Sequence, residues 1–272
     1  MHAQAQAQME SIHKAQDEAD LIGAVEPPSA LLPHFQNADK AGFADGIRNY
    51  LSVEFSGIRR VRGDGNCFYR AFLFSYLESV VAGLNGKDDT VVTKSYVELQ
   101  RFKGIIQESP ADLVAMGYSE VAFETFFDVF VDLLDRVSSM DSSEDLLAEF
   151  GEDGQSDYYV WYMRLLTACC LKQHAERFLP FLDDGAASID DYCTRSVEPM
   201  KQECEHLQIT ALTEYLAVET HIHYLDGSPC PPGAQLTVHS FQQKEHIPDT
   251  MYHIIRLHLL YRPGHYDVLT KK

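Results

Sequence analysis

The feature that most constrains this chain is a strand-like run that passes through a glycine-rich turn into a long apolar stretch. Residues 58–62 are typical of a strand, and residues 68–81 are typical of a helix. Cys67 stands where that helix begins. The first amides of a helix lack an intrahelical acceptor, and the helix dipole adds about half a positive charge there. The sequence therefore predicts a thiol at a helix N-terminus.

A thiol in this position meets the requirements for a nucleophile. The thiolate is the reactive form, and a free cysteine with a pKa of about 8.5 is mostly protonated at neutral pH, so a catalyst must stabilise the anion. Gly63 and Gly65 can take backbone conformations closed to other residues and can aim several amides at one point. That point suits the oxyanion of a tetrahedral intermediate.

A base is available near the C-terminus of the chain. Residues 262–264 (Arg-Pro-Gly) are typical of a turn, and a short strand follows them. Side chains two apart on a strand share a face, so we expect His265 and Asp267 to lie side by side. Asp267 can hold one imidazole nitrogen and leave the other for Cys67. Cysteine, imidazole and carboxylate make a cysteine-hydrolase constellation.

Each part of this pattern also has a simpler interpretation. Most cysteines are small buried hydrophobic residues, and a His-x-Asp pair on a terminal strand is usually structural. The joint occurrence of both parts, each in the required local context, favours catalysis.

Periodicity predicts that helices dominate the middle of the chain and strands its end. We expect helices over residues 68–81, 96–107, 123–137, 142–150, 156–171 and 209–217, and strands over residues 58–62, 221–225, 236–241, 253–261 and 266–269. This order predicts an α+β fold with helices packed around a small mixed β-sheet.

The N-terminal segment differs from the remainder. Residues 1–33 begin rich in Ala and Gln and are then interrupted by Pro27, Pro28 and Pro33. We expect this segment to lie outside the core, as a flexible or partner-dependent helix. Residues 34–272 are expected to form a single catalytic domain, which is within the size that one core supports.

Net charge and composition restrict the classes of partner that we expect the protein to bind. A formal net charge of −19 disfavours nucleic acid and anionic membranes as partners, because both attract clustered Lys and Arg. The charge suits a basic partner, although it also serves solubility alone. No apolar run is expected to cross a bilayer, and the N-terminus lacks the apolar segment of a signal peptide, which favours a cytoplasmic or nuclear location.

The six cysteines form no C-x-x-C pair and are interpreted as reduced thiols. His221 and His223 can share a strand face as ligands, but no second pair lies at a usual metal spacing. We therefore expect no metal.

Five ordered motifs resemble the ovarian-tumour (OTU) deubiquitinases, specifically the otubain branch. The nucleophile motif of that branch resembles residues 63–72 and 74–78, and its histidine motif resembles residues 260–267. Between them, residues 156–159, 164–167 and 197–200, followed by His206 and residues 209–212, are also similar to otubains and in the same order.

The resemblance implies a papain-like OTU fold and a thiol-dependent enzyme that removes ubiquitin from lysine side chains or from polyubiquitin, with no cofactor. It implies that Cys67 is the nucleophile, His265 the base and acid, and Asp267 the residue that orients His265. Asp64 matches the family's aspartate that shapes the oxyanion loop, through its amide or its carboxylate.

The same resemblance extends to partners. Residues 178–206 are similar to the region that receives the distal ubiquitin, where Phe181, Glu203 and His206 are the candidate contacts. Ubiquitin-conjugating enzymes are further candidate partners. Two alternatives stay open: a binding regulator that needs no catalysis, and a hydrolase for another ubiquitin-like modifier.

Overall fold

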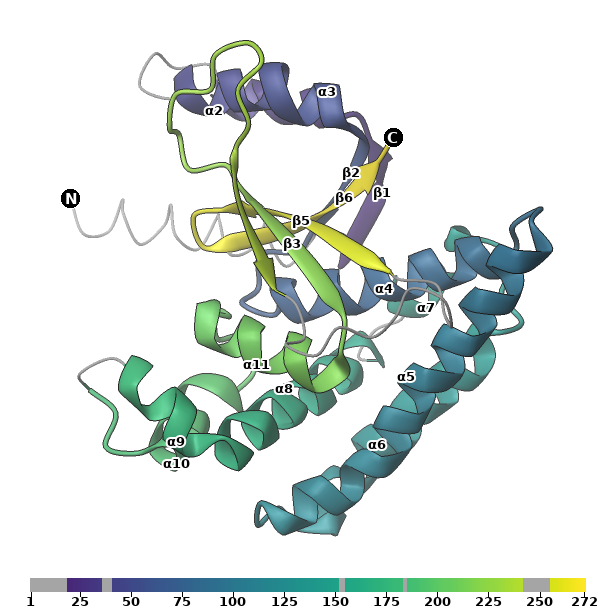
Figure 1. Ribbon diagram of the computed structural model, residues 1–272, viewed down its shortest axis with the longest axis vertical. Coiled ribbons are helices and arrows are strands. Elements are labelled where there is room, and N and C mark those ends of the chain that lie inside the picture. Colours follow the sequence, from purple (N-terminus) through teal and green to yellow (C-terminus); the bar gives the residue numbers. More distant parts are fainter. Residues whose placement is uncertain (1–18, 36–40, 152–154, 183–184, 242–254) are drawn as a thin grey trace.

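A six-stranded mixed sheet separates two layers of helices (Figure 1). The computed structural model describes residues 19–35, 41–151, 155–182, 185–241 and 255–272. The strand order is β1-β2-β6-β5-β3-β4, with β3 and β5 parallel and the other neighbours antiparallel. The strands are β1 (Ile22–Glu26), β2 (Phe55–Val61), β3 (Glu219–Tyr224), β4 (Thr237–Phe241), β5 (Arg256–Arg262) and β6 (His265–Lys271). The predicted α+β fold is confirmed, although residues 253 and 254 of one predicted strand lie outside the described residues.

The helices divide between the two faces of the sheet. One face carries α4 (Cys67–Leu84), α5 (Asp89–Ala115), α6 (Glu120–Val137), α7 (Ser143–Gly151), α8 (Gln155–Gln173) and α11 (His206–Leu216). The other face carries η1 (Pro28–Phe35), α2 (Ala41–Gly46), η3 (Ile47–Leu51) and α3 (Ser52–Glu54). Between α8 and α11 the chain forms α9 (Ala175–Phe178), η4 (Leu179–Phe181), α10 (Ile189–Tyr192) and η5 (Cys193–Val197). All six predicted helices are present.

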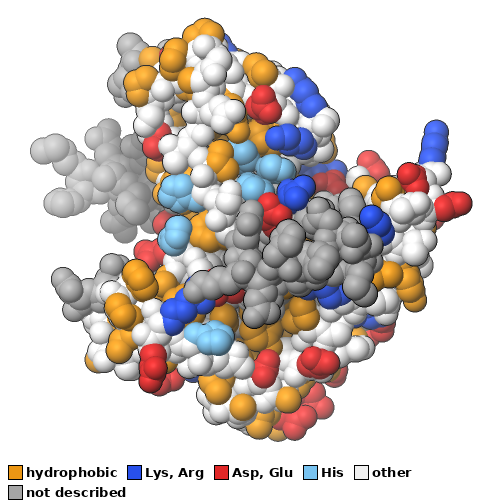
Figure 2. Space-filling model, in the orientation of Figure 1, with side chains coloured by type: hydrophobic (Ala, Val, Ile, Leu, Met, Phe, Trp, Pro, Cys, Tyr) orange, Lys and Arg blue, Asp and Glu red, His pale blue; other side chains and the backbone are white. Residues whose placement is uncertain are grey.

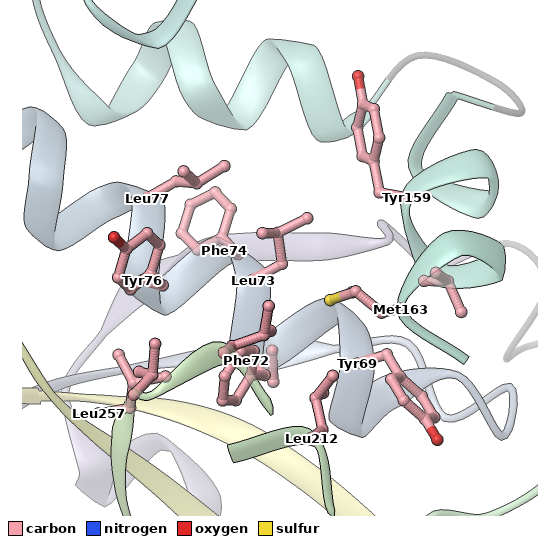
Figure 3. Packing of buried hydrophobic residues seen from close by; sticks show 14 of the residues in the cluster. Tyr69, Phe72, Leu73, Phe74, Tyr76, Leu77, Tyr159, Met163, Leu212 and Leu257 are labelled. Carbon is pink, nitrogen blue, oxygen red and sulfur yellow. The ribbon is translucent and has the colours of Figure 1, made fainter. Parts of the chain in front are cut away.

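Helix α4 is the centre of the larger core. Its aromatic residues Tyr69, Phe72 and Phe74 are fully buried and pack against α8 and the sheet (Figure 3). By length and composition α4 alone among the described helices could cross a membrane, which the sequence analysis did not anticipate, but 78% of it is buried inside the fold. Such burial on all sides is that of a core helix. The core therefore fixes the helix whose first residue is Cys67.

Helix α5 is longer than predicted because it passes through a proline. The predicted helix ended at residue 107, yet α5 continues to Ala115 with Pro110 inside it. Proline has no N–H to donate to the carbonyl four residues earlier, which here is that of Ile106. The hydroxyl of Ser109 donates to this carbonyl at 2.6 Å and replaces the missing bond.

The prediction that residues 1–33 lie outside the core is wrong for its last third. Strand β1 pairs with β2, and Ile22 is 4% exposed. Leu31 of η1 is fully buried in the smaller core, against the opposite face of the sheet. The apolar residues here are few, but Ile22 and Leu31 are buried by partners that are distant in the chain. Residues 1–18 lie outside the described residues, so the rest of that prediction stays a prediction.

Candidate active site

Cys67 is the first residue of helix α4, as predicted. A loop of five residues, 62–66, joins it to the end of strand β2. The side chain is 3% exposed, beneath the mouth of a small cavity. Because Cys67 is the first residue of the helix, its backbone N–H has no acceptor within the helix. This hydrogen-bond donor is therefore available to a group that lies beside the sulfur.

The carboxylate of Asp64 is fully engaged within the loop. Its Oδ1 accepts the backbone N–H of Asn66 at 2.9 Å and Nη1 of Arg70 at 3.1 Å. Nη2 of the same buried arginine lies 3.0 Å from Oδ2. Asp64 therefore shapes the loop through its carboxylate, and only its backbone amide remains to face a substrate.

Gly65 takes a conformation that requires glycine. Its φ is +79°, in the left-handed region that other residues rarely adopt. A Cβ atom at this position would lie 2.3 Å from the carbonyl oxygen of Lys201. Lys201 itself has a φ of +65°, so two loops with unusual backbone conformations meet beside Cys67.

The imidazole of His265 is held by a buried carboxylate. Nε2 of His265 lies 2.9 Å from Oδ1 of Asp267, which also accepts the N–H of Val61 at 3.0 Å. Oδ2 of Asp267 accepts two bonds from Arg262, at 3.0 and 2.6 Å. Burial raises the pKa of Asp267, but its bonds to His265 and Val61 and the nearby charges lower it more, to below its ordinary value. Asp267 is therefore an anion that orients His265.

His265 also interacts with Cys67 electrostatically. Burial lowers the pKa of His265, but the hydrogen bond to Asp267 and the interaction with Cys67 raise it more, to about 9. With Nε2 on Asp267, the nitrogen left for the sulfur is Nδ1. At neutral pH this imidazole is protonated between two groups that can carry negative charge. The structure thus brings together all four residues predicted to be catalytic.

Cys67 and His265 line two different cavities. A narrow one of about 230 Å³ is lined by Cys67, Gly264 and three tyrosines, Tyr224, Tyr261 and Tyr266. A groove of about 1050 Å³ is lined by His265 together with residues of β1 and β2. The narrow cavity reaches the sulfur, and the groove reaches the imidazole.

Two of the three predicted ubiquitin contacts lie at this site. Glu203 and His206 line the narrow cavity together with Cys67. The ring of His206 packs 4.8 Å from that of Phe241, and burial lowers its pKa, with a further contribution from His239. Phe181 lies elsewhere, on η4, where it is 71% exposed and not part of the cavity.

Two buried arginines were missed as site residues by the sequence analysis. Arg70 pairs with Asp64 and Asp157, and Arg164 bonds to Asn66 and to Gly65. Both side chains are fully buried. Each stands in an otherwise apolar helical stretch, and that contrast was the available signal, because a buried cation requires partners. The described residues contain no group of three or more His, Cys, Asp or Glu side chains able to hold a metal ion.

A thiol at a helix N-terminus, beside an imidazole oriented by a carboxylate, defines the class of thiol-dependent hydrolases. The comparisons place the chain within that class. The chain belongs to the otubain family, since the family model "Peptidase C65 Otubain" matches residues 14–271. The resemblance seen in the sequence is therefore confirmed.

Individual relatives align with this chain over most of their length. Human ubiquitin thioesterase OTUB1 is 38% identical over 221 residues, which cover 81% of this chain and 73% of that protein. The OVARIAN TUMOR DOMAIN-containing deubiquitinating enzyme 1 of Arabidopsis thaliana is 34% identical and covers 92% of this chain and 81% of its own. The solved ceOTUB1 ubiquitin aldehyde UBC13~Ub complex matches with a TM-score of 0.80 at 30% identity, over 97% of this chain and 99% of that one.

Proposed function

We propose that the chain is a deubiquitinating cysteine protease that hydrolyses isopeptide bonds between ubiquitin and lysine through Cys67, His265 and Asp267. The observation that carries the proposal is that His265 lies 2.9 Å from the carboxylate of Asp267 and interacts electrostatically with Cys67, the first residue of helix α4. The relatives named above are ubiquitin thioesterases and a deubiquitinating enzyme, which supports ubiquitin as the substrate.

In the first step the thiolate of Cys67 attacks the isopeptide carbonyl carbon. A sulfur–carbon bond forms, and the π electrons of the carbonyl move to its oxygen. When that tetrahedral intermediate collapses, the carbon–nitrogen bond breaks, and the imidazolium of His265 gives its proton to the departing lysine amine. The product is a thioester between Cys67 and the C-terminus of ubiquitin.

In the second step water replaces the amine. His265, now neutral, takes a proton from water as the oxygen attacks the thioester carbon. The carbon–sulfur bond then breaks and returns the thiolate beside a protonated His265. Asp267 remains ionised throughout, because its role is to orient and stabilise the imidazolium.

The oxyanion of both steps falls at the N-terminus of helix α4. The backbone N–H of Cys67 is the first hydrogen-bond donor to the oxyanion, and the helix dipole favours negative charge at this end of α4. The N–H of Asn66 is already bonded to Asp64, so it is not a donor to substrate. The backbone amide of Asp64 is the second candidate donor.

The two cavities assign the two parts of the substrate. A leaving amine has to lie on the side of His265, so the larger groove suits the acceptor lysine and its protein. The narrow cavity then suits the C-terminal tail of ubiquitin, with Glu203 and His206 as contacts. Phe181, exposed on η4, is proposed as a more distant contact with the distal ubiquitin.

Ubiquitin-conjugating enzymes are proposed as further partners. The matching solved structures contain ubiquitin aldehyde together with UBC13~Ub or UBCH5B~Ub, which favours binding of charged conjugating enzymes as a second function. The net charge of −19 suits the basic surroundings of ubiquitin's apolar face. The six free thiols support a reducing compartment, so a cytoplasmic or nuclear location is part of the proposal.

The test is a covalent one. Ubiquitin with a C-terminal electrophile is incubated with the wild type and with Cys67→Ala and His265→Ala. We expect labelling of the wild type, none of Cys67→Ala, and strongly slowed labelling of His265→Ala. An inert wild type that still binds charged conjugating enzyme supports the regulator instead. An inert wild type that reacts with another modifier's electrophile supports the third alternative.

A further inference from the structure

The guanidinium of Arg164 joins the two loops that flank Cys67. Its Nη2 donates to the carbonyl of Gly65 at 2.9 Å, to Oδ1 of Asn66 at 2.9 Å and to the carbonyl of Gln202 at 2.7 Å. Its Nη1 donates to the carbonyl of Val197 at 2.9 Å. Two of these acceptors belong to the loop before Cys67, one is the last residue of η5, and one lies between η5 and α11.

This arginine is held in a single orientation. The side chain is fully buried, and its guanidinium stacks on the ring of Tyr69 at 4.6 Å. Its Nε has no hydrogen-bond partner among the described residues. A buried donor without a partner lowers stability, so its retention indicates a constraint other than stability.

Asn66 extends the same network. Its Oδ1 accepts the backbone N–H of Lys201 at 2.9 Å as well as Nη2 of Arg164. Lys201 has a φ of +65°, a conformation that persists only where its surroundings determine it. Arg164 and Asn66 together hold this strained residue against Gly65.

One peptide group of the loop is consequently fixed at both ends. The carbonyl of Gly65 is bonded to Arg164, and the N–H of the same peptide group, that of Asn66, is bonded to the carboxylate of Asp64. The carbonyl of Asn66 accepts the N–H of Arg70 at 3.1 Å, so the peptide groups on both sides of Asn66 are held. The next N–H in the chain is that of Cys67, which has no intrahelical acceptor.

We propose that Arg164 is a positioning residue for the oxyanion site. By fixing the Gly65–Asn66 peptide it holds the N–H of Cys67 toward the position of the developing oxyanion, and it does so without touching substrate. The inference rests on the proposed function, because an oxyanion forms only if Cys67 attacks a carbonyl. His265 is oriented independently of Arg164, by Asp267.

Because Arg164 does not orient His265, reactions that form an oxyanion can be compared with one that does not. Arg164→Met and Arg164→Lys are compared with wild type in hydrolysis of a ubiquitin C-terminal fluorogenic amide, in alkylation of Cys67 by iodoacetamide, and in binding of ubiquitin aldehyde. Alkylation forms no oxyanion. The aldehyde adds the thiol across its carbonyl, so its oxygen occupies the oxyanion site.

We expect Arg164→Met to lower kcat about a hundredfold, the usual effect of losing one oxyanion donor. KM and the alkylation rate should remain within about threefold of wild type, and affinity for the aldehyde should fall with kcat. Arg164→Lys keeps the charge but not the planar fork, and it should recover only part of the loss.

Arg101→Met is the matched control. Arg101 is also a largely buried arginine that bonds to a backbone carbonyl, that of Leu216 at 3.0 Å, on the side of α5. Its replacement should lower the melting temperature and leave kcat unchanged. If Arg164→Met does not fold, Asn66→Ala and Arg164→Lys are combined in a double-mutant cycle, where their effects on kcat should fall short of additive.

The outcomes of these experiments distinguish failure of the positioning role of Arg164 from failure of the proposed function. A kcat unchanged in Arg164→Met, additive effects in the cycle, or equal losses in alkylation and in kcat each overturn the positioning role. A wild type that cleaves no ubiquitin substrate overturns the proposed function, and the inference with it.

Discussion

Nε2 of His265 lies 2.9 Å from Oδ1 of Asp267, two residues further along strand β6 and on the same face of the sheet. The carboxylate is completely buried, yet all of its near neighbours are donors. The carboxylate of Asp267 is therefore a fixed negative charge that stabilises the protonated imidazole of His265.

Replacing Asp267 by asparagine should therefore abolish most of the activity. The amide keeps the shape of the carboxylate but removes its charge, so the imidazolium loses its stabilising partner and Arg262 its ion pair. We expect kcat/KM for a ubiquitin fluorogenic amide to fall on the order of ten-thousandfold, by analogy with other triads. Asp226→Asn, which alters a carboxylate bonded to Ser228, is the control and should keep wild-type activity. A loss below tenfold contradicts the assigned role.

The pH dependence follows from the raised pKa of His265. Burial lowers this pKa from 6.5, and the hydrogen bond to Asp267 and the interaction with Cys67 raise it to about 9. A histidine whose pKa is higher in the folded state stabilises the fold fully below pH 6.5, and this contribution disappears as the pH rises through 9. The free energy of unfolding should accordingly decrease between pH 6.5 and 9.5, and kcat/KM should decline above pH 9.

Denaturant unfolding at several pH values checks the first expectation, and a pH–rate profile checks the second. His265→Ala is the matched variant for stability, since it removes the group that titrates. If that variant keeps the same alkaline loss of stability as wild type, the loss comes from another group.

Gly65→Ala should be destabilising and inactive. A φ of +79° costs a residue with a Cβ about 1–3 kcal/mol, and the contact with Lys201 adds to it. We expect the melting temperature to fall by roughly 4–8 °C. Gly104→Ala is the control, because a Cβ there meets nothing within 4 Å and lies in helix α5. That change should stabilise by about 0.5–1 kcal/mol. Equal melting temperatures for the two variants would be inconsistent with strain at Gly65.

The parts of the fold with regular periodicity were predictable from sequence. Helix α4 begins one residue before its predicted start, and strands β2, β3 and β6 overlap their predicted ranges. Strand β1 was missed because its five residues show no alternation, and its pairing with β2 shifts register between Ile22 and Val25. Its assignment depends on a partner strand, which local sequence does not specify.

The candidate active site also has parts that local sequence predicts and parts that it does not. The positions of Cys67, His265 and Asp267 in the fold were predictable because each follows from a local rule, a helix start or a spacing of two on a strand. The bonds of Arg164 to Gly65 and Asn66 cross 99 and 98 residues of chain. No local rule relates such positions, so their relation depends on the tertiary fold. The motifs at residues 156–159 and 164–167 now have a physical explanation, because they supply the partners of Arg70 and the side chain of Arg164.

Two largely buried imidazoles, those of His223 and His258, join the sheet to its smaller helical layer. Figure 2 shows histidine side chains gathered on one face of the molecule. The hydroxyl of Tyr50 lies 3.0 Å from Nδ1 of His223, whose Nε2 lies 3.0 Å from Nδ1 of His258. Every bond among these three side chains is satisfied when both imidazoles are neutral: tyrosine donates to the first ring, and the first ring donates to the second.

Acid should therefore loosen this layer. Burial, with smaller contributions from neighbouring cations and histidines, lowers the pKa of His223 to about 3 and that of His258 to about 4. A histidine with a lowered pKa stabilises the fold above pH 6.5 and loses that contribution as the pH falls toward the folded value, because only the unfolded chain takes up the proton. Each such imidazole contributes a slope of up to about 1.4 kcal/mol per pH unit.

Urea unfolding at pH 7 and pH 5 measures this slope. His223→Gln retains an acceptor for Tyr50 and a donor for His258 but cannot be protonated, so it should reduce the loss of stability in acid relative to wild type. His174→Gln changes an exposed histidine and should leave the loss unaltered. If the two variants respond to acid alike, the His223–His258 pair does not set the acid sensitivity, and His206, whose pKa is also lowered by burial, becomes the candidate source.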